Sequence, residues 1–126
     1  MNDKNKLTNT SSLVIKIKTS DIGNDNLSGI ATIENKSGII KFIYIYDKEI
    51  IIYDINPDML SDDFILLMDT IFDRYNVPLF VHSFFEDDKK IKYLLMDYHA
   101  HVLQDKKSKS TMTSDGTHLI YYREEV

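Results

Sequence analysis

Apolar and polar residues alternate along the first half of the chain, which predicts a strand-rich region. In residues 13–18, leucine or isoleucine stands at every second position, as in a strand with one buried face. Residues 29–34 and 39–46 flank a turn-forming run, residues 35–38, and therefore predict a hairpin. Residues 49–55 follow across a tight connection, so we expect a three-stranded antiparallel meander.

The segments around this meander complete the first half. Residues 39–55 are almost continuously rich in isoleucine, tyrosine and phenylalanine, which predicts that both faces of these strands are at least partly covered. Residues 21–26 contain Gly23 and are typical of a loop. Residues 1–12 are polar without periodicity, so we expect a flexible lead-in, followed by a single α+β domain over residues 13–126.

Helical spacing replaces the alternation after the meander. Ser61 is a predicted N-cap, and Asp62 and Asp63 suit the positive end of a helix dipole. Apolar residues then recur at intervals of three and four, which predicts an amphipathic helix. We expect it to end at Asn76, because Pro78 disfavours helical backbone in the residue before it.

A short strand over residues 79–85 and a second amphipathic helix opened by Asp87 and Asp88 come next. The chain then closes with a loop, a strand, a turn and a last strand over residues 104–110, 111–113, 114–117 and 118–122. The predicted fold class is α+β, with a mixed, mainly antiparallel sheet in the order meander, helix, strand, helix, C-terminal hairpin.

Composition narrows the classes of function. The chain has 126 residues, 43% of them hydrophobic, and contains no cysteine, which excludes disulfides and thiolate chemistry and suits a reducing compartment. It has no apolar leader and no apolar run long enough to cross a bilayer, so we expect a cytoplasmic protein without membrane contact. The net charge of −5 opposes direct binding to nucleic acid.

The order of predicted elements resembles that of the GCN5-related N-acetyltransferase (GNAT) family. The segments that carry the resemblance are residues 51–58, 79–83, 87–93 and 115–122, which look like that family's proline-containing strand exit, following strand, second helix start and last strand. The resemblance covers residues 28–124 and implies an acyl-CoA-dependent transferase fold.

The coenzyme-binding motif of that family is missing here. Its glycine-rich loop brings backbone N–H groups and a helix N-terminus to the coenzyme pyrophosphate. The corresponding residues 58–63 contain no glycine and no basic residue, and three of them are aspartates. Only residues 19–27 are available for two helices that the family places after its first strand. We therefore expect no bound cofactor and a degenerate form of the fold.

The histidines and tyrosines do not form a recognisable catalytic or metal-binding motif. His99 and His101 are two residues apart and point to different sides of a helix, so we expect no metal site. His82 and Ser83 are neighbours on a predicted strand and face opposite ways. The GNAT resemblance implies that Tyr93 or Tyr98 on the second helix could be a general acid, but the spacing assigns Tyr93 to solvent and Tyr98 to the core.

Charge is the remaining signal. Parallel neighbouring strands would bring the starts of both helices together, with an excess of carboxylates there. This predicted acidic patch, the candidate site for binding a basic protein partner, consists of Asp58, Asp62, Asp63, Glu86, Asp87 and Asp88. The same residues also fit a plainer role as helix-dipole partners that keep the protein soluble.

Three functions are compatible with these features. The first is a small acidic non-catalytic binding protein, such as an inhibitor, immunity or phage protein. It is favoured by the acidic patch, the small size, the lack of a catalytic motif and a composition rich in lysine, asparagine and isoleucine, which often accompanies mobile or phage genes. The second is a degenerate GNAT-type acyl-CoA-dependent N-acetyltransferase. The third is a structural or assembly subunit that uses the apolar strands of residues 39–55 as an interface.

Overall fold

The computed structural model describes residues 16–21 and 28–124. The predicted lead-in of residues 1–12 and the first three positions of the first predicted strand lie outside the described residues. The loop predicted over residues 21–26 also lies outside them, apart from Asp21, which belongs to a strand.

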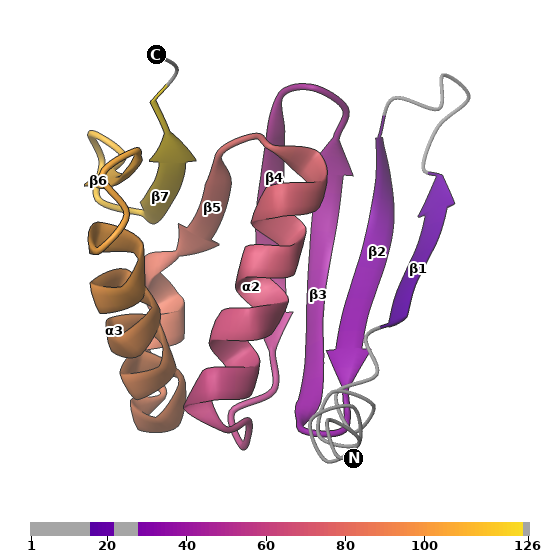
Figure 1. Ribbon diagram of the computed structural model, residues 1–126, viewed down its shortest axis with the longest axis horizontal. Coiled ribbons are helices and arrows are strands. Elements are labelled where there is room, and N and C mark those ends of the chain that lie inside the picture. Colours follow the sequence, from indigo (N-terminus) through magenta and orange to yellow (C-terminus); the bar gives the residue numbers. More distant parts are fainter. Residues whose placement is uncertain (1–15, 22–27, 125–126) are drawn as a thin grey trace, which may run out of the picture.

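The described residues form a sheet with two α-helices, in the predicted order (Figure 1). The elements are β1 (Lys16–Asp21), β2 (Ser28–Asn35), β3 (Gly38–Ile45), β4 (Glu49–Ile55), α2 (Ser61–Tyr75), β5 (Leu79–His82), the 3-10 helix η1 (Ser83–Asp87), α3 (Lys89–Leu103), β6 (Ser108–Met112) and β7 (His118–Arg123). The predicted α+β class and the meander, helix, strand, helix, hairpin order are confirmed.

All seven strands belong to one mixed sheet in the spatial order β1-β2-β3-β4-β5-β7-β6. Only the neighbours β4 and β5 run parallel, and the other pairs are antiparallel. Parallel strands end at the same edge of a sheet. Since α2 follows β4, and η1 and α3 follow β5, both α-helices begin at that edge and run back along the sheet (Figure 1).

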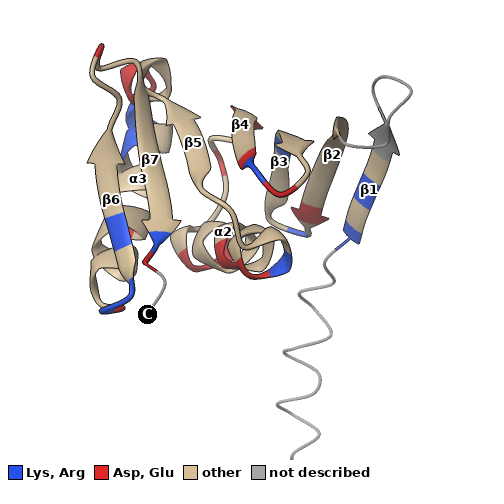
Figure 2. Cartoon of the chain, turned by 90° about the horizontal axis from the view of Figure 1, so that it is seen from above, with Lys and Arg blue, Asp and Glu red and all other residues tan. Residues whose placement is uncertain are grey.

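The core lies between the helices and one face of the sheet. Alternate residues of the strands are buried on this face, and the apolar stripes of both helices pack against them. Aromatic rings of the sheet and the helices pack together. The ring centroids of Phe42 on β3 and Tyr75 on α2 are 5.6 Å apart, and those of Tyr98 on α3 and Tyr121 on β7 are 5.1 Å apart. Figure 2 shows α2 on one side of the sheet, below β5, β4 and β3.

The start of α2 differs from the prediction at its cap. Leu60, in extended conformation, occupies the N-cap position and makes no side-chain cap, while Ser61 is the first helical residue. The Ser61 hydroxyl instead donates to the Asp97 carboxylate at 2.5 Å, which joins α2 to α3. The other end is as predicted: Asn76 has a left-handed φ of 51° and its N–H donates to the Phe72 carbonyl.

Strand β5 ends at His82, three residues earlier than predicted, because η1 follows it directly. The His82 ring explains the change. Its Nδ1 accepts the backbone N–H of Phe84 at 3.0 Å, which caps the 3-10 turn and ends the strand. Ser83 therefore belongs to η1 and is not a strand neighbour of His82.

The C-terminal hairpin is present, but β6 starts at Ser108, within the predicted loop. Gly116 takes a positive φ of 75° in the connecting turn, a conformation that suits glycine. The Asp115 carboxylate accepts hydrogen bonds from the hydroxyls of Thr117 and Thr113 at 2.7 and 2.8 Å. These bonds, first that of Thr117, lower the pKa of Asp115 to about 2.

Candidate functional site

The predicted acidic residues do lie near the edge of the sheet where the two helices begin. Three of them precede or open α2, and three lie in η1 or cap α3. Their surroundings differ, and only some of them are available to a partner.

Two of the six carboxylates stabilise the start of α3. Asp88 is the N-cap of this helix, and its carboxylate accepts the backbone N–H groups of Lys90 and Ile91 at 2.8 and 3.2 Å. Asp58 accepts a hydrogen bond from the Lys90 ammonium at 2.7 Å, and this bond raises the pKa of Lys90. Both carboxylates therefore have structural roles.

Glu86 lies on a different side of α3 from Asp58. It lines a pocket with α3 and the C-terminal hairpin, whereas Asp58 lines another with the start of α2, Tyr93 and Asp97. The helix separates them, so Glu86 does not extend the surface formed by Asp58.

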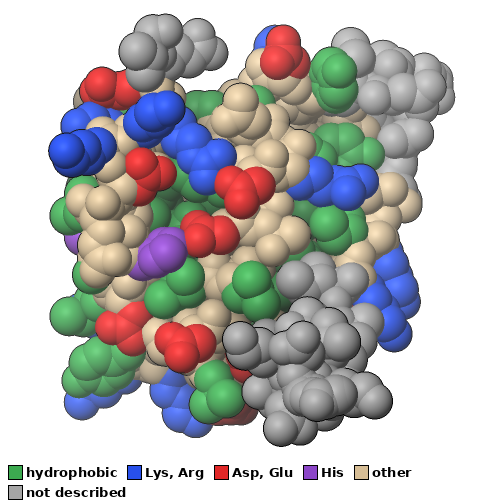
Figure 3. All heavy atoms as spheres, in the orientation of Figure 1, with side chains coloured by type: hydrophobic (Ala, Val, Ile, Leu, Met, Phe, Trp, Pro, Cys, Tyr) green, Lys and Arg blue, Asp and Glu red, His purple; other side chains and the backbone are tan. Residues whose placement is uncertain are grey.

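The carboxylates of Asp62, Asp63 and Asp87 form no hydrogen bond or ion pair with other described residues. The exposed lysines Lys89 and Lys92 follow Asp87 closely along the chain. Figure 3 shows acidic and basic side chains interspersed over the helix-covered face. The helix-start edge is therefore a mixed surface with a moderate excess of negative charge.

The start of α2 offers an anion little attraction. The segment before it has Leu60 at the N-cap and Met59 buried. The nearby side-chain charges are the carboxylates of Asp58, Asp62 and Asp63 and the ammonium of Lys90, which is bonded to Asp58. Negative side chains complement the partial positive charge of a helix N-terminus and repel a phosphate.

His101 has a partner that the sequence did not reveal. Its Nε2 lies 2.6 Å from an Asp69 carboxylate oxygen, which joins α3 to α2. Asp69 lies on α2 beside the buried Met68, and a polar residue at the margin of an apolar helix stripe was the available signal. Among the described residues, no three histidine or acidic side chains form a group that could hold a metal ion.

Two other histidines lie side by side on the sheet face opposite the helices. His82 and His118 are cross-strand partners on β5 and β7, with ring centroids 4.8 Å apart. The Thr117 hydroxyl donates to Asp115, so the His118 Nδ1, 2.9 Å from that hydroxyl, is its donor. His82 accepts the backbone N–H of Phe84 at its Nδ1.

The tyrosines of α3 divide as predicted. Tyr98 is fully buried and packs against Phe64 and Tyr121, while Tyr93 is 63% exposed. Burial, together with the negative charge of Asp69, raises the pKa of Tyr98. The Tyr98 hydroxyl therefore keeps its proton, and the side chain is part of the hydrophobic core.

The sheet face opposite the helices is strongly apolar at its centre. The sequence predicted cover on both faces of the meander, but in the described part of the chain the two α-helices pack on one face only. Strand pairing places one apolar residue from each of five adjacent strands in a row across the other face. This row, called the open-face row below, consists of Ile30, Ile43, Ile51, Phe80 and Ile120.

Polar and charged residues lie on one side of the open-face row and on the outer strands of the sheet. Lys41 and Asp54 form an ion pair at 3.8 Å on one side of it, and the histidine pair continues that side. Lys18 on β1 and Lys109 on β6 stand on the two outer strands of the sheet. Apolar residues at the centre and charged residues at the periphery are the usual arrangement of a protein–protein interface.

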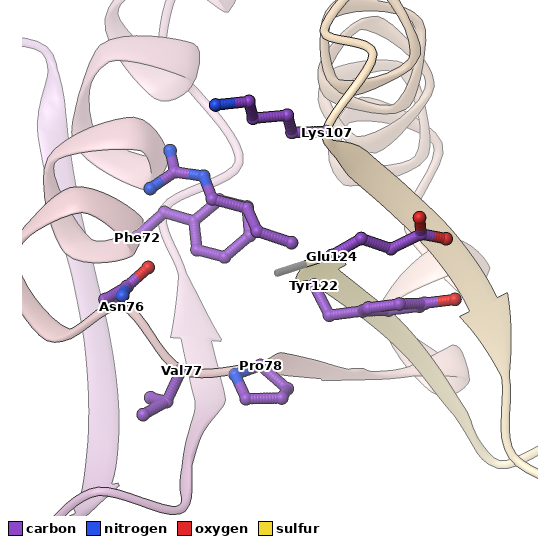
Figure 4. A pocket seen from close by; sticks show the side chains of 8 residues that line it. Phe72, Asn76, Val77, Pro78, Lys107, Tyr122 and Glu124 are labelled. Atoms are coloured by element: carbon purple, nitrogen blue, oxygen red, sulfur yellow. The ribbon is translucent and has the colours of Figure 1, made fainter. Parts of the chain in front are cut away.

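A pocket with a volume of about 600 Å³ lies between the end of α2 and the end of β7 (Figure 4). Two cationic side chains, Arg123 and Lys107, line it, and the first of them is already engaged by neighbouring side chains. The Arg123 guanidinium lies 4.1 Å from the Phe72 ring centroid and donates to Asp73 at 2.6 Å. The side chain of Lys107 also lines the pocket, together with Tyr122 and Glu124.

Comparisons with protein-family models, with curated proteins and with solved structures found no match. Within residues 16–21 and 28–124, neither α-helix combines the length and the apolar character needed to cross a membrane.

Proposed function

We propose that this chain is a protein-binding and assembly subunit whose partner surface is the open face of the sheet. The observation that carries the proposal is the open-face row, in which apolar side chains from five adjacent strands stand side by side on a face that neither α-helix of residues 16–21 and 28–124 covers. Contiguous exposed apolar surface of this kind typically marks an interaction site.

The size of the face supports an interface between whole proteins. Seven strands spaced about 4.8 Å apart make a surface about 30 Å wide, and strands of this length make it about 20 Å deep. The resulting area of about 600 Å² approaches the roughly 800 Å² that each partner buries in a standard interface.

A second copy of the chain is the partner that fits this face best. Ile51 lies on β4, the central strand of seven, so the apolar row is centred on the sheet. A twofold axis near Ile51 would place row against row and leave the lysines of β1 and β6 at the rim. Two sheets that pack face to face lie about 10 Å apart, a distance that isoleucine and phenylalanine side chains fill.

The test is the oligomeric state. Sedimentation velocity of the full chain at micromolar concentrations should show a dimer, and the double variant Ile43→Thr/Ile51→Thr should sediment as a monomer. Threonine keeps the β-branched shape that strands favour, so the variant should retain the circular dichroism spectrum of the folded chain.

Leu103→Gln is the matched control, since Leu103 is 57% exposed on α3, away from the open face. This variant should remain dimeric. A wild-type chain that stays monomeric at high concentration, or a dimer that survives the double substitution, would contradict the proposal.

A second candidate is the binding of a basic protein at the helix-start edge. It is favoured by the three carboxylates of Asp62, Asp63 and Asp87, which have no partner among the described residues. Replacing all three by lysine should leave the fold intact and abolish capture of the basic partner from the native host, identified by mass spectrometry. Asp88 is excluded from this variant because it caps α3.

The GNAT resemblance is supported by the element order and by the parallel β4–β5 pair followed by helices. The carboxylates at the start of α2 oppose the binding of a coenzyme diphosphate there. Calorimetry with acetyl-CoA distinguishes an acyltransferase from a binding protein, because saturable binding would favour the enzyme.

A further inference from the structure

A small pocket under α3 has the composition of a ligand site and is separate from the surfaces described above. It has a volume of about 370 Å³ and lies between α3, η1 and the hairpin β6–β7. Leu95 and Leu119 form apolar walls, and Met96 and Met112, about half exposed, complete the lining. Binding sites for small molecules are usually concave and mainly apolar, with a few polar groups that orient the ligand.

The polar group of interest is the hydroxyl of Tyr121. Tyr121 lines the pocket and its side chain is 0% exposed, yet its hydroxyl has no hydrogen-bond partner among the described residues. Buried polar groups almost always have a partner, and an unpaired one destabilises the fold. The neighbouring tyrosine, Tyr98, does reach a carboxylate oxygen of Asp69, at 3.5 Å.

The charges around the pocket limit which chemical group can form a hydrogen bond with the Tyr121 hydroxyl. Burial, with a contribution from the negative charge of Glu86, raises the pKa of Tyr121 to about 12, so the hydroxyl keeps its proton and is a donor at neutral pH. Glu86 also lines the pocket and would repel an anionic acceptor. The remaining polar lining residue, His99, lies with its Nδ1 3.3 Å from the Ser110 hydroxyl. A neutral acceptor such as a carbonyl oxygen fits these constraints.

We propose that this pocket binds a small, neutral, largely apolar molecule, about the size of one ring with a short substituent, whose carbonyl oxygen accepts the hydrogen bond of the Tyr121 hydroxyl. The site is independent of the open face, because Tyr121 projects toward the helices while the open-face row projects away from them. The size follows from the volume, which is near the lower limit for ligand pockets.

Two probes of nearly equal shape test the hydrogen bond. Acetophenone carries a carbonyl, and ethylbenzene has a methylene group in its place. In amide-resolved NMR titrations of the full chain at pH 7, acetophenone should shift the resonances of residues around the pocket. It should bind about fivefold more tightly than ethylbenzene, the ratio expected for one hydrogen bond to an otherwise unpaired hydroxyl.

The variant Tyr121→Phe removes only the hydroxyl and should fold, because that group has no partner to lose. It should bind the two probes with equal affinity. Retention of the fivefold preference by this variant would overturn the proposal. A wild-type chain that binds both probes equally would also overturn it, and would indicate that water already satisfies the hydroxyl.

The second test is a variant in which a larger side chain fills the pocket. Met96→Trp adds bulk at the mouth, at a position that is 52% exposed, and should abolish binding of both probes. Leu103→Trp makes a comparable change at another exposed position of α3 that does not line the pocket, and should leave both affinities unchanged. Unchanged binding to Met96→Trp, or no pocket-specific shifts in the wild type, would place the probes elsewhere and refute the site.

Discussion

Tyr98 and Tyr121 bury their rings in the same part of the core but treat their hydroxyls differently. The Tyr98 hydroxyl lies 3.5 Å from a carboxylate oxygen of Asp69, whereas the Tyr121 hydroxyl has no hydrogen-bond partner among the described residues. Both are fully buried, and burial is the main cause that raises the pKa of each. The buried phenols therefore link the stability of the fold to alkaline pH.

The sign of this linkage follows from the proton. In the unfolded chain Tyr121 loses its proton near pH 10, and in the folded chain it keeps the proton up to about pH 12. Ionisation of the unfolded state then stabilises it, so the free energy of unfolding falls as pH rises from 10 to 12. Tyr121→Phe should remove about 1.4 kcal/mol of the fall between pH 8 and pH 11, measured by urea unfolding at pH 8, 10 and 11.

The matched control for this pH dependence is Tyr93→Phe. Tyr93 is 63% exposed, so its substitution should leave the alkaline fall of the wild type unchanged. An equal loss of stability in Tyr121→Phe and wild type between pH 8 and 11 would show that the hydroxyl is not the titrating group.

At the scale of elements, the neighbouring aspartates Asp87 and Asp88 before α3 have different structural roles. Asp88 caps the helix through two backbone N–H groups, whereas Asp87 lies in η1 and makes no such bond. Asp88→Ala should lower the free energy of unfolding by about 1 kcal/mol, the usual cost of losing an N-cap. Asp87→Ala should change it by less than about 0.5 kcal/mol, as for other surface substitutions.

Urea denaturation of both variants checks this difference. Equal effects at the two positions would mean that negative charge near the helix dipole, and not the cap geometry, stabilises α3.

Local patterns predicted most elements because each depends on residues close in sequence. The hairpin β2–β3, the strand β4 and the end of α2 at Asn76 follow from alternation, turn residues and one left-handed position. One error arose where a distant contact decided the local structure. Ser61 binds Asp97 of α3 and leaves the cap to Leu60, a choice that the local sequence does not encode.

The candidate site was less predictable than the fold for the same reason. The sequence correctly implied that a parallel strand pair brings both helix starts to one edge. The sequence did not reveal that Lys90 forms an ion pair with Asp58, or that α3 separates Glu86 from the other acidic residues. Both features depend on how the helices pack. The apolar content of β3 and β4 was visible, but not which face the helices would cover.

At the scale of the whole molecule, the sheet has one face packed on two helices and one face with the open-face row at its centre. A dimer that joins two open faces would couple unfolding to dissociation, so its melting temperature must depend on protein concentration. A monomer has no such dependence. Thermal unfolding therefore tests the proposed assembly by a route that does not need the dimer to be isolated.

A hundredfold increase in concentration adds about 2.7 kcal/mol per dimer, which should raise the melting temperature of the wild type by roughly 5 to 10 °C. Ile43→Thr/Ile51→Thr should melt at the same temperature throughout the range. Leu103→Gln should keep the wild-type slope. Since Ile43 and Ile51 are already partly exposed in the single chain, wild type and double variant should converge at low concentration. A constant offset between them at every concentration would instead mean that the two isoleucines stabilise the folded monomer.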